Sequence, residues 1–174
     1  MTIKAVEGVI SNAIRIMQTF LPAELDIIDG EMSDGLTMED VPNERYFDYE
    51  LDETYIPQGP SITITPESTT GLSILSTTNS PGLDRSEHRV IVGVHVKDSG
   101  NEGPSSLRKR CLRYERAIVR VLCIKYPTFP NAGLETVTVT EVDGDITYKD
   151  TGQEGGQYVR SARVPLRIRT YESL

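Results

Sequence analysis

Side chains that commonly perform catalysis are scarce in this chain. Histidine occurs only at positions 88 and 95. The sequence contains no G-x-x-x-x-G-K-[ST] phosphate loop, no G-x-S-x-G nucleophile turn, no H-E-x-x-H and no C-x-x-C. His95 falls in the middle of a predicted strand, and no partner that would orient its imidazole for proton transfer can be placed beside it. We therefore predict a structural or surface role for His95, and no enzymatic function.

The two cysteines and an Asp-Gly turn also fit structural roles. Cys111 and Cys123 lie on one predicted helix, about 18 Å apart along its axis, which is too far for a disulfide. Buried, reduced thiols are therefore predicted. Asp143 and Asp145 resemble the start of a calcium-binding loop, but Tyr148 occupies the position where such loops need glycine. Their Asp-Gly step is instead typical of a β-hairpin turn.

Three acidic residues, Asp48, Glu50 and Asp52, alternate with Tyr49 and Leu51. Such a run could bind a divalent cation, but its spacing matches no diagnostic ligand pattern. The alternation fits an exposed strand edge equally well. We interpret the three carboxylates as a solvated or subunit-contact surface, and we predict no metal ion and no other cofactor.

The strongest candidate for a binding surface is one side of an amphipathic helix expected at residues 104–126. Pro104 is favoured in the first turn of a helix, and six later apolar residues fall within about one third of the helical circle. These are Leu107, Cys111, Tyr114, Ile118, Val121 and Leu122. The opposite side is expected to be exposed to solvent and is basic. Its residues are Lys109, Arg113, Arg116 and Arg120. This basic stripe is either a solvated face or a contact for an acidic protein surface or for DNA.

The last strand, expected at residues 158–172, carries a second basic surface. Arg163, Arg167 and Arg169 share one face of it, and apolar residues occupy the other. Three arginines cannot enter an apolar core without partners. They are therefore expected to face solvent, a neighbouring subunit or a channel, where the acidic segment 24–53 of a neighbour would complement them.

Hydrophobic patterns place these residues on two helices and several strands. A first helix is expected at residues 3–21, where apolar residues recur every three or four positions and Pro22 ends the pattern. Residues 23–59 are acidic and poorly periodic, which indicates a long loop with one short strand near residues 45–51. Further strands are expected at residues 61–65, 72–77, 88–97, 134–142, 146–150 and 158–172. The strands at 134–142 and 146–150 are expected to form a hairpin through the Asp-Gly turn.

This order of elements predicts an α+β fold with a mostly antiparallel β-sheet of about four to five strands and two main helices packed on one face. The 174 residues are enough for one domain with a real core. The domain is expected to span residues 1–174, with an acidic loop or insertion at about 23–59.

Charge is distributed unevenly along the chain. The formal net charge is −8, to which residues 22–103 contribute −13 and residues 104–174 contribute +4. Such a dipolar subunit could stack or form a ring with opposite faces meeting, whereas a free duplex-DNA binder is usually more basic. No apolar run approaches the about 20 residues of a membrane span, and the first residues lack the pattern of a signal peptide. We therefore expect a soluble protein made in a cytosol, without a membrane partner.

The layout resembles the tail terminator (tail completion) proteins of long-tailed bacteriophages. The resemblance covers residues 3–21 and about 60–174. It rests on the helix that ends at Leu21-Pro22, the β-branched strand after Pro60, the strand at 89–96 and the helix opened by Pro104-Ser105-Ser106-Leu107. It is most evident in the ending Ser161-Ala162-Arg163-Val164-Pro165-Leu166-Arg167-Ile168-Arg169-Thr170-Tyr171-Glu172.

The resemblance implies a mechanical function in the virion. Family members form a ring, usually hexameric, on the head-proximal end of the tail tube, where they stop tube polymerisation and provide the surface that joins head and tail. The implied partners are other copies of the chain, the tail tube protein and a neck or connector protein. Genome DNA passes through the lumen without sequence-specific binding, and assembly takes place in the cytoplasm of the host. Contacts between copies would be heterologous.

Three other functions remain open from the sequence. The chain could be a neck or head-completion connector that bridges portal and tail, because such proteins have a similar size and a related fold. It could be a nucleic-acid-binding α+β domain that uses the basic helix, although its acidic total disfavours this. A cytosolic enzyme of unknown class is disfavoured by the missing motifs.

Overall fold

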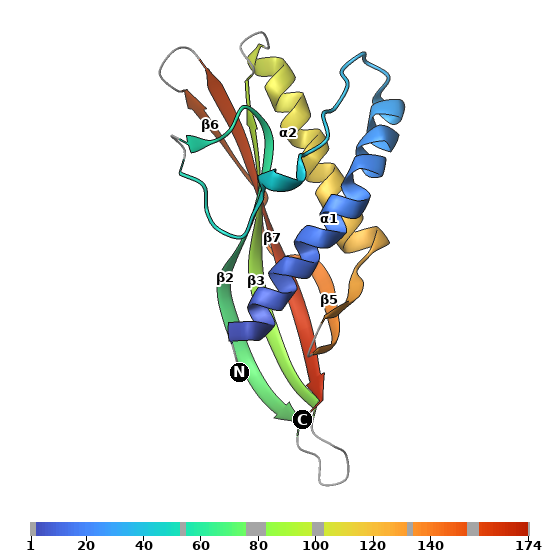
Figure 1. Ribbon diagram of the computed structural model, residues 1–174, viewed down its shortest axis with the longest axis vertical. Helices are drawn as coiled ribbons and strands as arrows, with labels where there is room; N and C mark the ends of the chain where they lie inside the picture. The colour runs from blue at the N-terminus through green and yellow to red at the C-terminus, as the bar shows by residue number, and fades with distance from the viewer. Residues whose placement is uncertain are drawn as a thin grey trace.

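The computed structural model describes residues 3–52, 55–75, 83–98, 103–131, 134–152 and 157–173. In this part of the chain, two long helices pack on one face of a seven-stranded mixed sheet (Figure 1). The expected α+β class is confirmed, with more strands than the four to five expected. The helices are α1 (Ile3–Met32) and α2 (Pro104–Val119), which continues into a π-helical turn, Arg120–Lys125. The strands are β1 (Tyr46–Phe47), β2 (Gly59–Leu75), β3 (Leu83–Lys97), β4 (Thr128–Asn131), β5 (Leu134–Val142), β6 (Thr147–Gly152) and β7 (Tyr158–Ser173).

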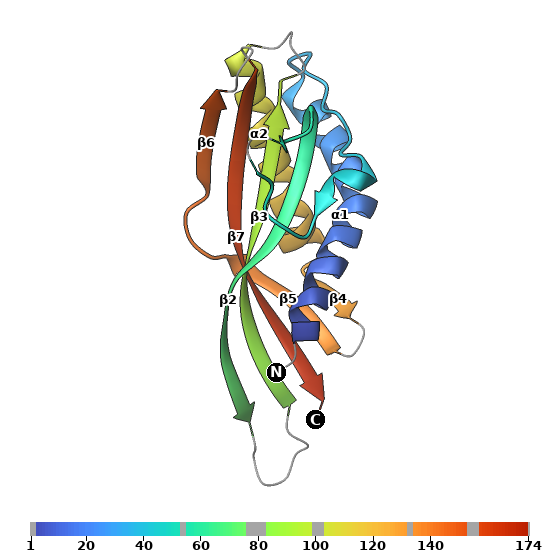
Figure 2. The same cartoon turned by 60° about the vertical axis from the view of Figure 1, so that its left-hand side comes forward.

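Three long strands form the centre of the sheet. β3 pairs antiparallel with β2 on one side and with β7 on the other, so the last strand of the chain lies inside the sheet. Two-residue β1 adds to β2 in parallel and makes the sheet mixed. Figure 2 shows β2, β3 and β7 as a twisted ribbon that continues past the helices. The expected strands at 61–65 and 72–77 both belong to β2, except that residues 76 and 77 lie outside the described residues.

The expected hairpin between residues 134–142 and 146–150 is wrong. β5 and β6 do not pair with each other but follow one another along the same edge of β7. Val142 lies opposite Leu166, and Thr147 lies opposite Arg163. Pro165 falls between these two pairs, and its carbonyl accepts a hydrogen bond of 2.8 Å from the Asp143 N–H. Because proline has no N–H to donate, it suits the point where one neighbouring strand ends before the next begins.

α1 does not end at Pro22 as expected but continues to Met32. A proline inside a helix costs roughly 3 kcal/mol, through a lost hydrogen bond and a steric clash. Leu21, Leu25 and Ile28 continue the apolar stripe past the proline, and all three are buried. Burying Leu25 and Ile28 contributes roughly 2 kcal/mol each, which offsets the cost of the proline. Residues 23–32 of the expected loop are therefore helix.

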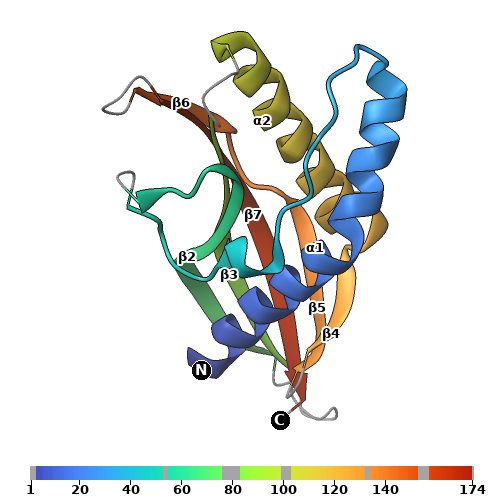
Figure 3. The same ribbon diagram turned by 45° about the horizontal axis from the view of Figure 1, so that its top comes forward.

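The core lies between the helices and one face of the sheet. All six apolar residues expected on one side of α2 are buried, as are Val90, Val92, Val94 and Val96 of β3. Figure 3 shows α1 crossing this face beside α2. The other face of the sheet has no helix over it among the described residues, and it carries the alternate side chains of β2, β3 and β7. The molecule is therefore a two-layer structure, and the sheet face that no described helix covers is called the uncovered face below.

Candidate functional site

The basic stripe of α2 faces carboxylates of the same chain. Lys109 lies 3.2 Å from Asp34, and Arg116 lies 2.9 Å from Glu31. Arg120 also contacts Glu31, at 3.0 Å. The acidic residues belong to the last turns of α1 and to the segment after it, so one part of the chain neutralises another. We call this set of pairs the ionic clasp. Its members are Glu24, Asp29, Glu31, Asp34, Lys109, Arg113, Arg116, Arg120 and Lys125.

Arg113 is the centre of the ionic clasp. Its side chain is only 4% exposed, so the expectation that this side of the helix faces solvent is wrong for Arg113. The guanidinium donates to Asp29 Oδ1 at 3.2 Å, to Asp34 Oδ1 at 2.5 Å and to the Leu36 carbonyl at 2.8 Å. The hydrogen bonds from Arg113 and Lys109 hold the pKa of Asp34 well below its usual range. Arg113 therefore fixes the chain where it leaves α1.

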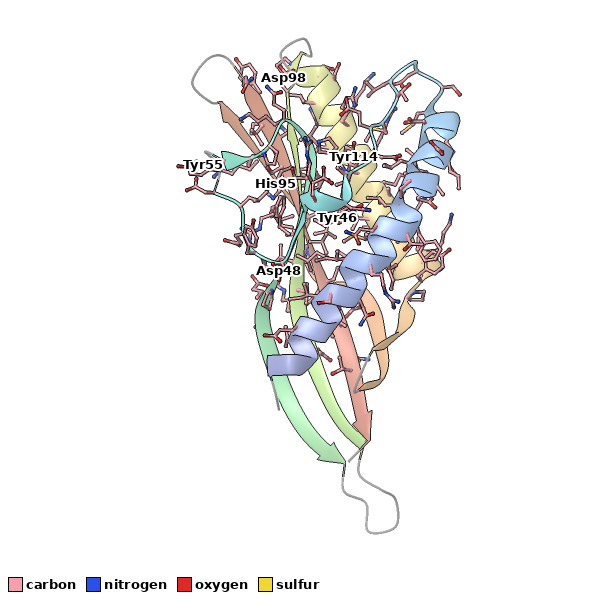
Figure 4. All side chains as sticks on the ribbon, in the orientation of Figure 1. Tyr46, Asp48, Tyr55, His95, Asp98 and Tyr114 are labelled. Atoms are coloured by element: carbon pink, nitrogen blue, oxygen red, sulfur yellow. The ribbon has the colours of Figure 1, made fainter. Side chains whose placement is uncertain are left out.

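Two further contacts hold the same segment, residues 33–42, against the helices. The Met38 N–H donates to Asp29 Oδ2 at 2.6 Å, and the Tyr114 hydroxyl donates to the Glu39 carbonyl at 2.5 Å. Burial raises the pKa of Tyr114, so its hydroxyl stays protonated. Figure 4 shows Tyr114 between α2 and this segment. Residues 33–42 form neither a helix nor a strand, as the expected long loop predicts, but they are bound along the helical layer.

Glu24 is the second buried charge of the ionic clasp. Its side chain is 2% exposed and accepts hydrogen bonds from Arg120, at 3.0 Å, and from Lys125. Burial alone would raise the pKa of Glu24, but the hydrogen bonds from Lys125 and Arg120 outweigh burial and lower it. Glu24 is therefore ionised in the folded protein and is held by two cations.

The π-helical turn explains how both cations reach Glu24. Residues five apart in an α-helix point about 140° away from each other, because each residue turns about 100°. A π-helix makes i to i+5 hydrogen bonds, which bring such residues onto the same side. The Tyr126 N–H donates to the Val121 carbonyl at 2.9 Å in this spacing. Arg120 and Lys125 are five residues apart and both contact Glu24.

Arginines and carboxylates also pair across the uncovered face of the sheet. Arg167 contacts Glu87 at 3.3 Å, Glu141 at 3.2 Å and Asp143 at 2.7 Å. Hydrogen bonding to Asp143 raises the pKa of Arg167. Arg169 contacts Glu87 at 3.0 Å. These arginines face away from the core as expected, but their partners are in the same chain rather than only in a neighbour.

The acidic run at 48–52 lies beside this face. Glu50 pairs with Arg163 at 3.0 Å, and both side chains are exposed. Asp48 and Asp52 are also exposed, and no ion pair of Asp48 occurs among the described residues. Tyr49 is more than half exposed, and Tyr55 is 79% exposed and lies at one side of the molecule (Figure 4). This exposed part of the chain, residues 48–52 and Tyr55, is called the acidic tyrosine segment below.

His95 lies on the floor of a cleft on the uncovered face. Its Nδ1 is 2.9 Å from Ser161 Oγ, and its Nε2 is 3.3 Å from Thr63 Oγ1. The three residues belong to three adjacent strands, so the imidazole connects β2, β3 and β7. Gly93 makes room for this arrangement, because a Cβ there would lie 2.4 Å from Thr63 Oγ1. Sequence reasoning could not place these partners, since strand register is not visible in a single sequence.

An apolar groove lies between the end of α1 and α2. It has a volume of about 470 Å³. Met32 and Leu112 give it an exposed apolar centre, and charged side chains form its rim. The rim residues are Asp34, Lys109, Arg113, Glu115 and Arg116. Two of the basic residues predicted as interface residues, Lys109 and Arg116, therefore border an apolar surface while they pair within the chain.

The cysteines agree with the structural role predicted for them. Cys111 is fully buried and Cys123 is partly buried, and both are reduced. Burial raises the pKa of Cys111 to about 12 and that of Cys123 to about 11. Within the described residues, no group of three or more histidine, cysteine or acidic side chains is arranged to hold a metal ion. None of the described helices combines the length and apolarity that crossing a membrane requires.

No protein-family model matches this sequence, and no curated protein matches it. The functional conclusion therefore depends on the fold, on the surfaces described above and on the arrangement of elements along the chain.

Proposed function

We propose that this chain is a structural virion protein, a ring-forming tail terminator that caps the head-proximal end of a phage tail tube. It stops tube polymerisation and provides the surface on which the head docks. Copies of the chain, the tube protein and a neck or connector protein are its partners. Burial of protein surface at the interfaces between these partners stabilises the assembly, so the function requires neither a cofactor nor a reacting side chain.

The observation that carries the proposal is the one-sided layer structure. Two helices cover one face of the sheet, and among the described residues no helix covers the other face, where residues 50–51 border the cleft at His95. The uncovered face is polar and bears paired arginines and carboxylates. An ion-paired polar face suits a surface that lines a channel or meets a neighbour.

The charge arrangement favours passage of DNA over binding of DNA. A DNA-binding surface needs lysines and arginines that are free to displace counterions from phosphates. In this chain the basic stripe of α2 and the arginines of β7 are neutralised by carboxylates of the same chain. The net charge of each copy is −8. A ring of such copies repels phosphate, so DNA would pass through its lumen without being held.

A test of this function is the growth of tail tubes. Tubes are assembled from the tube protein of the same genome and are then offered more tube protein, with or without this chain. We expect tubes capped by the chain to stop growing, and tubes mixed with an unrelated acidic protein of similar size to continue. Tubes that grow normally at saturating amounts of the chain would overturn the proposal. Binding to portal complexes in the same preparation would then identify a neck connector.

A further inference from the structure

The groove between α1 and α2 is an apolar surface that the chain itself leaves uncovered. Leu112 is 38% exposed and Met32 is 45% exposed, although both belong to helices with a well-buried opposite side. Lys109 and Arg116 stand at its rim, and each is also about half exposed. An apolar centre with a charged rim is the common composition of a protein–protein contact.

The acidic tyrosine segment has the complementary composition. Tyr55 and Tyr49 are large exposed rings, and tyrosine is among the residues that contribute most to binding when they are buried at an interface. Asp48, Glu50 and Asp52 flank them, and no cation occurs within residues 46–52. The rim of the groove instead carries two exposed cations, Lys109 and Arg116, beside Asp34 and Glu115. Each of these cations pairs with one carboxylate of its own chain and can contact a second, as Arg120 contacts both Glu24 and Glu31.

The two surfaces lie on opposite sides of the molecule. Figure 4 labels Tyr55 at one side, and Figures 1 and 3 show the C-terminal end of α1 at the other side. One copy therefore cannot fill its own groove with its own Tyr55. A contact between one of these surfaces and the other surface on the next copy is a head-to-tail contact. Repetition of a head-to-tail contact closes into a ring when the rotation from one subunit to the next permits it.

Pairing of sheet edges between copies is a less suitable contact. β2 is an edge strand beyond its short pairing with β1, but it has Pro66 and two breaks of register along this edge. On the opposite side of the sheet, β6 has six residues and β4 has four. Proline, bulges and short strands are the features by which edge strands avoid pairing with other chains. A contact through side chains is therefore favoured.

We propose that Tyr55 of one copy inserts between Met32 and Leu112 of the next copy, with the acidic tyrosine segment over the rim that holds Lys109 and Arg116. The occupant of the groove is a second copy of this chain. This inference rests on the proposed ring function and names the two surfaces that build the ring.

The experiment uses two cysteine variants and a short bifunctional maleimide in the presence of tail tubes. One preparation carries Asp52→Cys and the other carries Glu115→Cys, so that Tyr55, Met32 and Leu112 all stay in place. The parent chain controls for reaction at its own two thiols. We expect cross-linked dimers only when the two variants are mixed. A chain that carries both substitutions should give a ladder of cross-linked oligomers. Absence of mixed dimers on capped tubes, or dimers from Glu115→Cys alone, would overturn the inference.

Blocking variants separate this inference from the proposed function. Leu112→Glu and Tyr55→Ser should each lower the number of capped tube ends at least tenfold. Ile124→Glu and Tyr158→Ser change exposed residues outside the two surfaces and should leave capping unchanged. If both blocking variants cap tubes like the wild type, the inference fails and the proposed function stands. If the wild type caps no tubes, the proposed function fails and the inference fails with it.

Discussion

Arg120 on the π-helical turn and Glu24 on α1 lie 3.0 Å apart, and they join the two helices across a point where neither helix is regular. Pro22 interrupts the hydrogen bonds of α1 two residues before Glu24. The wider turn at 120–125 places Lys125 beside Arg120 on the same carboxylate. The two irregularities therefore lie at one contact between the helices, and the ionic clasp extends from there to the end of α1.

Removing Arg113 should lower stability clearly. Arg113→Met leaves Asp29 and Asp34 without their shared cation and frees the Leu36 carbonyl. Loss of one partner of a buried ion pair typically costs about 3 kcal/mol. Arg116→Met is the matched control, because its pair with Glu31 is exposed and should contribute less than about 1 kcal/mol. Urea unfolding of both variants measures the difference, and equal losses would contradict the buried role of Arg113.

Glu24 should make stability depend on pH in the acidic range. Its pKa in the folded protein is lowered from the ordinary value of 4.5, so its stabilisation is present above that value and is lost as the pH falls through the lowered pKa. Glu24→Gln should lower the free energy of unfolding by roughly 1 to 3 kcal/mol at pH 7. The difference in this free energy between wild type and variant should become smaller below pH 4.5. Unfolding at several pH values measures this. A difference in unfolding free energy that stays constant down to pH 3 would show that Glu24 is not the titrating group.

Substitution of two glycines should have opposite effects. Gly93→Ala places a Cβ 2.4 Å from Thr63 Oγ1 and 3.1 Å from His95 Nε2. Thr63 must then move away from His95, and we expect this overpacking to lower the free energy of unfolding by about 1 to 3 kcal/mol. Gly30→Ala lies in α1, where an added Cβ meets nothing within 4 Å, and should gain up to about 1 kcal/mol from helix propensity. Thermal unfolding checks both, and a neutral Gly93→Ala would refute the tight packing at His95.

Shortening the valines of β3 should test the assignment of the sheet faces. Val92 and Val94 are buried against the helices, so the double substitution to alanine should cost several kcal/mol, about 2 per site. Ile124→Ala removes a larger but exposed side chain and should change stability by less than about 0.5 kcal/mol. An unchanged melting temperature for the double variant would mean that these strand faces are inverted.

The sequence was sufficient for the elements whose hydrophobic period is long and regular. The alternation in β3 and β7 and the stripe of α2 each define one buried side, because only one period fits those residues. The end of α1 differs from the prediction because a proline usually ends a helical pattern, whereas Leu21, Leu25 and Ile28 keep the helical spacing across Pro22. This spacing is the feature of the sequence from which the continuation of α1 past Pro22 can be predicted.

Two other features required the three-dimensional structure. The Asp143-Gly144 step is compatible both with a hairpin and with a passage between two strands on one edge, and only the register opposite Pro165 decides between them. The basic stripe of α2 follows from the helical spacing of its residues, but its partners in the same chain do not follow from that spacing. Asp29, Glu31 and Asp34 fall in the segment predicted as a long loop, and a loop prediction does not place their side chains beside α2. The predicted interface roles of the stripe and of the acidic run stay predictions.

The most direct test of the proposed ring is electron microscopy of tail tubes incubated with the chain, with class averages of both tube ends. We expect a closed ring with a central hole at one end of each tube. We also expect native mass spectrometry of the released caps to give a whole number of copies consistent with the symmetry in the averages. Bare tube ends at saturating protein, or irregular deposits along the tube wall without a ring, would contradict the proposed ring.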